Sequence, residues 1–190
     1  ISGTFYPNVW TVEKIEAEVH KKELNQVKLL GLREPEFEYT DKTSFLLATS
    51  KCVEYLNYTT DRLSRVPTSI IIAMAGVESG WGTSRFANEG NALFGVRTWD
   101  LKNVAHMKAK GNPDASWGVK KYKTKCQSVH DMIKILNRHP AYKEFRIERE
   151  KQLDSGKWNY RTLMVLMNAW STNPDYHEII LQAIVDNKLP

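Results

Sequence analysis

A long apolar run that ends in one acid and two glycines is the feature that most constrains how this chain folds. In "VPTSIIIAMAGVESGWG" the proline suits the first turn of a helix, and the glycines after the acid would end it. Residues recur at the i, i+3, i+4 and i+7 positions of one helix face: Ile71, Met74, Ala75 and Glu78. The spacing therefore predicts a helix that places Glu78 in line with an apolar stripe.

A carboxylate in that position has two interpretations. On an apolar stripe it is partly desolvated, so its pKa rises, and a proton held near neutral pH is what a general acid needs to protonate a leaving oxygen. Alternatively, Glu78 is a helix-end acid that points into water, although an acid at a helix C-terminus opposes the helix dipole. Spacing alone leaves both interpretations open.

The residues after Glu78 suit a carbohydrate. Ser79 and the two following glycines predict a tight turn that a substrate chain can approach closely. Flat apolar faces on which sugar rings could stack are supplied nearby by Trp81, Phe86, Phe94 and Trp99.

Elsewhere helical patterns dominate, at about 11–30, 43–63, 128–139, 140–153, 159–169 and 174–187, with a short helical segment in 83–94. Residues 95–125 instead carry β-branched and aromatic residues on both sides of a Gly-Asn-Pro-Asp turn. We therefore expect a mainly α (α+β) protein. Residues 1–40 would be an N-terminal helical extension, and residues 41–190 a helical domain with a small inserted β-hairpin lobe at about 95–125.

The composition limits the kinds of partner that this chain is expected to bind. The net charge of +5 and the pI of about 9.1 suit an acidic polymer, or simply a basic solvated surface. Basic residues alternate with acids, and no recognition helix is evident, so we expect no nucleic-acid partner. No run of eighteen apolar residues is present, which argues against a membrane span. The opening "ISGTFYPNVW" lacks a leader pattern and suggests a mature form or a fragment.

No metal or other cofactor is expected, because the histidines are scattered and the cysteines form no CxxC pair. Cys52 and Cys126 could pair in an oxidising compartment, but two separate buried thiols are the favoured interpretation.

Three motifs carry a resemblance to a known family. The stretch "VPTSIIIAMAGVESGWGTSRFANEGNALFG" resembles the bacterial and phage glucosaminidases of glycoside hydrolase family 73, whose fold is lysozyme-like. The segment "LNRHPAYKEFRIEREKQ" is similar to the Bax-like branch of these enzymes. "WSTNPDY" stands in the place of the family's Tyr-Ala-Thr-Asp-Pro-x-Tyr motif. Together the matches span roughly residues 66–188.

The resemblance implies an endo-β-N-acetylglucosaminidase that cleaves peptidoglycan after N-acetylglucosamine, with Glu78 as general acid. Trp170 stands where the family has its first Tyr and Asn173 where it has Asp, so Trp170 keeps a stacking face and loses the hydroxyl. The expected substrate-binding residues are Ser79, Trp81, Asn91, Phe94, Trp170 and Tyr176.

A second acid is expected in the β lobe, where Asp100 and Asp114 are the candidates. Aspartates in turns are usually structural, and Asp114 lies at the expected hairpin tip, so Asp100 is the favoured catalytic partner. The alternative is that neither acts and the N-acetyl group of the substrate assists.

Two other functions compete with this one. A lytic transglycosylase shares the fold and the Glu-Ser at the helix end, but it leaves anhydro-muramic ends. A non-catalytic glycan-binding module of a phage tail or secretion apparatus is the other. The glucosaminidase hypothesis predicts a monomer, or a module of a longer chain, that acts on peptidoglycan strands. It would be periplasmic, secreted or part of a phage virion.

Overall fold

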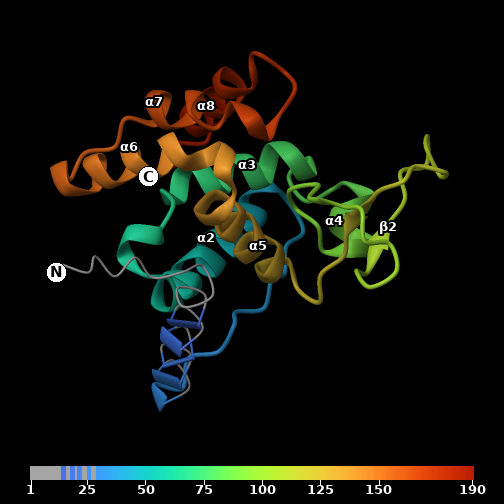
Figure 1. Ribbon diagram of the computed structural model, residues 1–190, viewed down its shortest axis with the longest axis horizontal. Helices are drawn as coiled ribbons and strands as arrows, with labels where there is room; N and C mark the ends of the chain where they lie inside the picture. The colour runs from blue at the N-terminus through green and yellow to red at the C-terminus, as the bar shows by residue number, and fades with distance from the viewer. Residues whose placement is uncertain (1–13, 16–17, 20, 23–24, 27–28) are drawn as a thin grey trace, which may run out of the picture.

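A computed structural model describes residues 14–15, 18–19, 21–22, 25–26 and 29–190, and it confirms a mainly helical architecture with a small β lobe (Figure 1). The elements, in chain order, are α2 (Lys42–Thr59), η1 (Arg62–Ser64), α3 (Thr68–Ser79), α4 (Arg85–Gly90), β1 (Arg97–Thr98), β2 (His106–Met107), β3 (Gly118–Lys120), α5 (Lys125–Arg138), η2 (Pro140–Tyr142), α6 (Lys143–Ser155), α7 (Tyr160–Val165), η3 (Asn168–Trp170) and α8 (Tyr176–Asp186).

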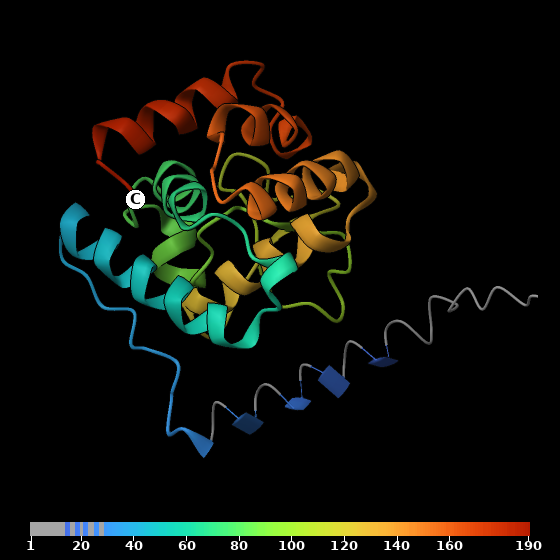
Figure 2. The same cartoon turned by 90° about the vertical axis from the view of Figure 1, so that its left-hand side faces the viewer.

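The helix α3 is the centre of the body. It packs against α2 on one side and α8 on the other, and Figure 2 shows it between the two. Every residue from Ser69 to Gly76 is buried. The prediction of one apolar stripe therefore understates the burial of this helix, because α3 is enclosed on nearly all sides. Glu78 is the first charged side chain that the helix carries, and it comes at the last turn.

The cysteines are both buried, as expected, but they are not separate thiols. Cys52 on α2 and Cys126 on α5 form a disulfide, with their Cα atoms 5.6 Å apart. The favoured expectation of free thiols is therefore wrong. The two cysteines meet because α2 and α5 pack side by side, and a separation of 74 residues along the sequence gives no sign of that packing.

The first expected helix, at about 11–30, lies partly outside the described residues. The residues of 14–29 that the structure describes are helical. Ahead of α2, Phe37 and Tyr39 pack edge-on against Phe45 of the core. In the part of the chain that the structure describes, no helix is long and apolar enough to cross a membrane.

The β lobe is a three-stranded antiparallel sheet in the order β1-β3-β2, not a lone hairpin. Strands β2 and β3 form the expected hairpin, in which His106 pairs with Lys120 and Met107 with Val119. The added strand β1 pairs with the outer edge of β3, with Arg97 opposite Val119. The lobe projects from the body beside α4 (Figure 1).

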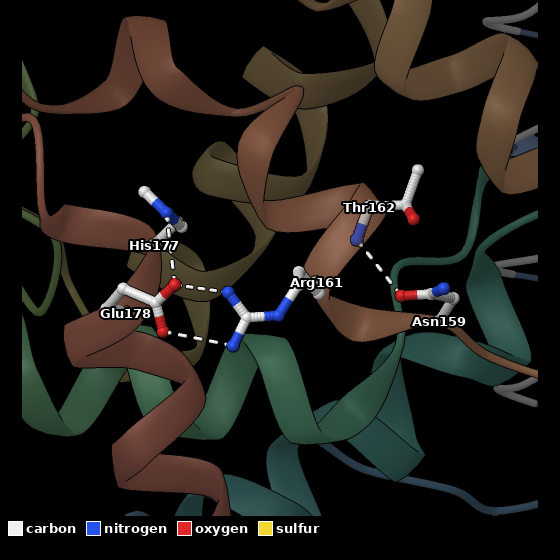
Figure 3. Close-up of polar contacts among 5 residues, drawn as sticks. All are labelled: Asn159, Arg161, Thr162, His177 and Glu178. Carbon is white, nitrogen blue, oxygen red and sulfur yellow. Dashed lines mark hydrogen bonds and ion pairs between the residues drawn. The ribbon is translucent and has the colours of Figure 1, made fainter.

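A cluster of polar contacts ties α7 to α8 (Figure 3). Arg161 of α7 holds both carboxylate oxygens of Glu178, and His177 also contacts Glu178 at 3.4 Å. The side chain of Asn159 caps α7 by accepting a hydrogen bond from the amide of Thr162 at 3.1 Å. The ion pair is solvent-exposed and therefore adds little to global stability. Its location matters more, because the ion pair holds together the two helices whose connecting segment reaches the functional site.

A left-handed turn ends α3 immediately after the acid. Gly80, Trp81 and Gly82 have φ values of 59°, 55° and 84°, so three consecutive residues adopt the left-handed conformation. The amide of Trp81 donates to the carbonyl of Gly76 at 2.7 Å, and the indole folds back over that glycine. A Cβ at position 76 would lie 2.2 Å from the indole ring.

Gly76→Ala is therefore expected to destabilise the protein, although Gly→Ala inside a helix usually adds stability. Displacing Trp81 should cost about 1–3 kcal/mol and lower Tm by about 3–10 °C. Differential scanning calorimetry measures this. Gly111→Ala, at a site where a new Cβ would meet open space, is the matched control. A Gly76→Ala variant that melts at or above the wild type would show that the indole does not need this glycine.

Candidate active site

A cleft of about 710 Å³ opens where the helical body meets the β lobe. Its lining comes from the end of α3, the segment leading into β1, the α5–α6 connection and η3. The lining residues are Glu78, Phe94, Gly95, Val96, Arg97, Trp99, Ile135, His139, Tyr142, Ala169, Trp170, Ser171 and Thr172. Of the residues that the structure describes, Glu78 is the only acid on this surface.

Glu78 is crowded by protein and yet open to the cleft. The residue as a whole is exposed to solvent, although it belongs to the last turn of the buried helix α3. Burial raises the pKa of the Glu78 carboxyl above its ordinary value of 4.5, and hydrogen-bonding interactions with Tyr176 and Trp170 offset part of that rise. The accessible surface of Glu78 faces the cleft, so its exposure is compatible with the burial that raises its pKa. The direction of this pKa change is the one expected for a carboxyl in line with an apolar stripe.

Tyr176 and Trp170 reach Glu78 from the C-terminal helices. Tyr176 is the first residue of α8 and is 5% exposed. Burial, together with the neighbouring Glu78 carboxylate, raises the pKa of its phenol. Its hydroxyl makes no hydrogen bond that satisfies the usual limits of length and angle, so its contact with the carboxylate is a loose one. Trp170 ends η3 and directs its indole, which has only a donor N–H, toward the same acid.

Aromatic rings form the wall beside the acid. Trp170 meets Phe94 edge-on, with ring centroids 6.3 Å apart and an interplanar angle of 85°. On its other side Trp170 lies 6.3 Å from Tyr142 at a tilt of 39°. Phe94 and Tyr142 are buried, whereas Trp170 is half-buried. Since the flanking rings hold it in place, Trp170 presents a fixed apolar surface to the cleft.

The β lobe contributes an exposed cation and an exposed tryptophan to the cleft lining. Trp99 is 66% exposed and offers a free ring face. Arg97 is exposed, and its guanidinium carbon sits 4.1 Å from the ring centre of Trp117. That stacking fixes the guanidinium at the rim of the cleft.

Two of the predicted substrate-binding residues have structural contacts instead and do not line the cleft. Ser79 is 1% exposed, and its hydroxyl donates to the carbonyl of Ala75 and accepts from the amide of Gly82 at 2.8 Å. Trp81 packs against Gly76 and Phe45, with the ammonium of Lys42 over its ring. Both residues stabilise the turn that ends α3. They therefore position Glu78 from within the protein and not from the cleft.

Asn91 also lies outside the cleft lining. It adopts the left-handed conformation at the end of α4, and its amide donates to the carbonyls of Tyr122 and Lys123 at 3.1 and 3.0 Å. The ammonium of Lys125 donates to its carbonyl oxygen. Asn91 thus joins the Gly90–Gly95 turn to the exit of the β lobe, which keeps Phe94 in place.

Asp100, the expected second acid, is absent from the cleft lining. Its carboxylate accepts hydrogen bonds from the backbone and side chain of Asn103, which lower its pKa. Asp114 is exposed at the hairpin end. A low pKa and a turn-capping role suit a structural aspartate better than a proton donor, so the structure gives the catalytic assignment of Asp100 no support.

Several lining residues were not predicted from the sequence. Tyr142 and His139 stand within the quoted "LNRHPAYKEFR" segment, whose His-Pro-x-Tyr run was a usable signal. The backbone amide of Ala141 donates to Nδ1 of His139 at 3.2 Å, which orients that ring. Arg97 and Ile135 carry no local signal, because only the fold brings β1 and α5 to the same cleft.

An isolated acid with a raised pKa, at the end of a buried helix and facing an aromatic cleft between a helical body and a small β lobe, is the arrangement expected of a lysozyme-like glycoside hydrolase. The family model described as "Mannosyl-glycoprotein endo-beta-N-acetylglucosaminidase" matches residues 58–189. The chain therefore belongs to this glucosaminidase family, as the resemblance predicted.

Individual relatives agree with this assignment. The chain is 30% identical over 132 residues to Protein bax of Escherichia coli, covering 67% of this chain and 45% of that protein. It is 29% identical over 126 residues to the exo-glucosaminidase LytG of Bacillus subtilis, covering 62% and 43%. The chain thus spans a little under half the length of these curated relatives.

A solved structure supports the fold. The catalytic domain of the autolysin Auto from Listeria monocytogenes superposes with a TM-score of 0.59, covering 88% of this chain and 94% of that one. At 18% identity this similarity concerns the fold alone.

Glu78→Gln is expected to raise stability at neutral pH. Because the pKa of Glu78 is higher in the folded than in the unfolded protein, ionisation destabilises the folded state above the folded pKa, and the effect vanishes below the unfolded value near 4.5. The variant should melt above the wild type at about pH 8 and together with it at about pH 3.5. Melting curves across this range test it, with Glu89→Gln as an exposed control. A difference in Tm between the variant and the wild type that grows toward acid pH would contradict this prediction.

Proposed function

We propose that this chain is a peptidoglycan hydrolase, an endo-β-N-acetylglucosaminidase that cuts the glycan strand after N-acetylglucosamine. The observation that carries the proposal is the Glu78 carboxyl, held at a raised pKa on the wall of the aromatic cleft. The acid can keep its proton until a glycosidic oxygen is in reach. Trp170 and Trp99 would hold sugar rings on either side of that oxygen.

The proposed reaction begins with proton transfer from Glu78 to the leaving oxygen as the bond from that oxygen to C1 breaks. A second carboxylate does not line the cleft in the described part of the chain. We therefore favour the route in which the acetamido oxygen of the N-acetylglucosamine bonds to C1 as the leaving group departs. Water then attacks C1, the acetamido group is released, and the proton from water returns to Glu78.

The relatives support a glucosaminidase and leave its mode of attack to be tested. The family model carries the word endo in its description, whereas LytG is named an exo-glucosaminidase. The Cys52–Cys126 disulfide fits an oxidising compartment, so we place the protein in the cell envelope, outside the cell or in a phage virion.

Glu78→Gln should abolish hydrolysis of purified peptidoglycan, with a loss of at least about 10²- to 10⁴-fold, because the amide has no proton to give. Glu89→Gln, which changes an exposed acid of α4 outside the cleft, should keep wild-type activity. Mass spectrometry of the wild-type products should show reducing N-acetylglucosamine ends on fragments of mixed length.

Anhydro-muramic ends would identify a lytic transglycosylase, and single disaccharides released from one end would indicate exo attack. A wild type that binds the glycan without cutting it would support the non-catalytic module. A Glu78→Gln variant with most of its activity would rule out Glu78 as the acid.

Trp170→Phe should keep the ring face and remove the indole N–H that lowers the pKa of Glu78. The pKa of Glu78 then rises, the acid stays protonated to higher pH, and the alkaline limb of the kcat/KM profile should move upward. Trp99→Phe, on the same cleft, should leave the limb in place. An unmoved limb in Trp170→Phe would mean that this residue acts only as a surface for the sugar, in which case Trp170→Ala should mainly raise KM.

A further inference from the structure

The positive charge of this protein is concentrated in the lobe that forms one side of the cleft. Residues 97–125 contain eight Lys and Arg residues and two Asp residues, a net charge of +6. The whole chain carries +5, so the remaining residues are close to neutral and slightly acidic. The basic character is therefore a property of this segment, which runs from β1 to the first residue of α5, and not of the chain in general.

Many of these cations are engaged within the protein. The ammonium of Lys120 pairs with Asp131 at 2.9 Å, that of Lys125 donates to Asn91, and that of Lys108 donates to backbone carbonyls of the hairpin. Arg97 differs from these three. It lines the cleft, and in the described part of the chain no carboxylate lies within ion-pair distance of it.

The guanidinium of Arg97 is also held in place before any ligand arrives. Its carbon lies 4.1 Å from the ring centre of Trp117, and its backbone is fixed by pairing with Val119 in the sheet. A planar cation that is held against an indole face still has its N–H groups free at the edge. This geometry suits two parallel hydrogen bonds to a carboxylate.

We propose that Arg97 forms an anion-binding subsite that takes a carboxylate carried by the glycan strand, and that it is a specificity-determining residue. The proposal rests on the proposed function, because it concerns the substrate of the same cleft. Peptidoglycan carries carboxylates on its peptide stems, and on the lactyl groups when the peptides are removed, whereas oligomers of N-acetylglucosamine carry none. The enzyme then selects anionic strands over neutral ones.

The test compares kcat and KM on three soluble substrates: peptide-bearing glycan strands, the same strands after amidase removal of the peptides, and neutral oligomers of N-acetylglucosamine. Arg97→Gln should lose about tenfold in kcat/KM on a carboxylate-bearing strand, mostly through KM. On the neutral oligomers it should stay within about twofold of the wild type. A loss confined to the peptide-bearing strand identifies the stem carboxylate, and a loss that persists after amidase treatment identifies the lactyl carboxylate.

Two further variants separate charge from shape. Arg97→Lys keeps the charge and should recover part of the affinity. Lys102→Gln removes an exposed cation of the same lobe that does not line the cleft, and it should change KM little. The proposal is overturned if Arg97→Gln loses activity equally on neutral and anionic substrates, or if it loses none.

Equilibrium binding in the Glu78→Gln background distinguishes this proposal from the enzymatic one. If wild-type protein cuts none of the substrates, yet adding Arg97→Gln weakens binding to the anionic strands alone, the glucosaminidase proposal fails and the anion subsite stands. If both substitutions together bind anionic and neutral strands as well as Glu78→Gln alone, the subsite fails whatever the enzyme cleaves.

Discussion

The burial of α3 on nearly all sides is the constraint on which the rest of the structure depends. An α-helix enclosed by α2 and α8 can carry no charge along its length without a heavy desolvation cost. Its first charge therefore comes at the end, at Glu78, where the chain leaves the core. The same enclosure that stabilises the body also desolvates this carboxyl, so the packing of the core and the pKa of the acid have one physical cause.

The turn after Glu78 fixes the direction in which this carboxyl points. Three consecutive left-handed residues reverse the chain within one turn, and Trp81 returns over Gly76. The phenol of Tyr39 donates to the carbonyl of Gly82 at 2.7 Å, which fixes the turn from the outside. The glycine-rich stretch thus serves to stop the helix at the acid and to seal the core behind it, rather than to contact a sugar.

Sequence reasoning predicted most of the helices and singled out Glu78 as a candidate acid because both depend on local patterns. Glu78 stood out as one carboxylate at the end of an apolar run, and Phe94, Trp170 and Tyr176 came from motifs that the family shares. It did not predict that Ser79, Trp81 and Asn91 make contacts within the protein and lie outside the cleft lining, because closeness along the chain does not reveal which way a side chain points after a left-handed turn. Arg97 and Tyr142 needed the fold, since only tertiary packing brings them to the cleft that Glu78 lines.

The disulfide between Cys52 and Cys126 closes a covalent loop around the working parts of the molecule. That loop runs through α3, the acid and the whole β lobe, including the exposed hairpin tip at 111–114. A protease that cuts once at this tip would therefore leave two fragments still joined by a covalent bond. Such a nicked molecule would keep its halves together, and it would come apart only where thiols are available to reduce it.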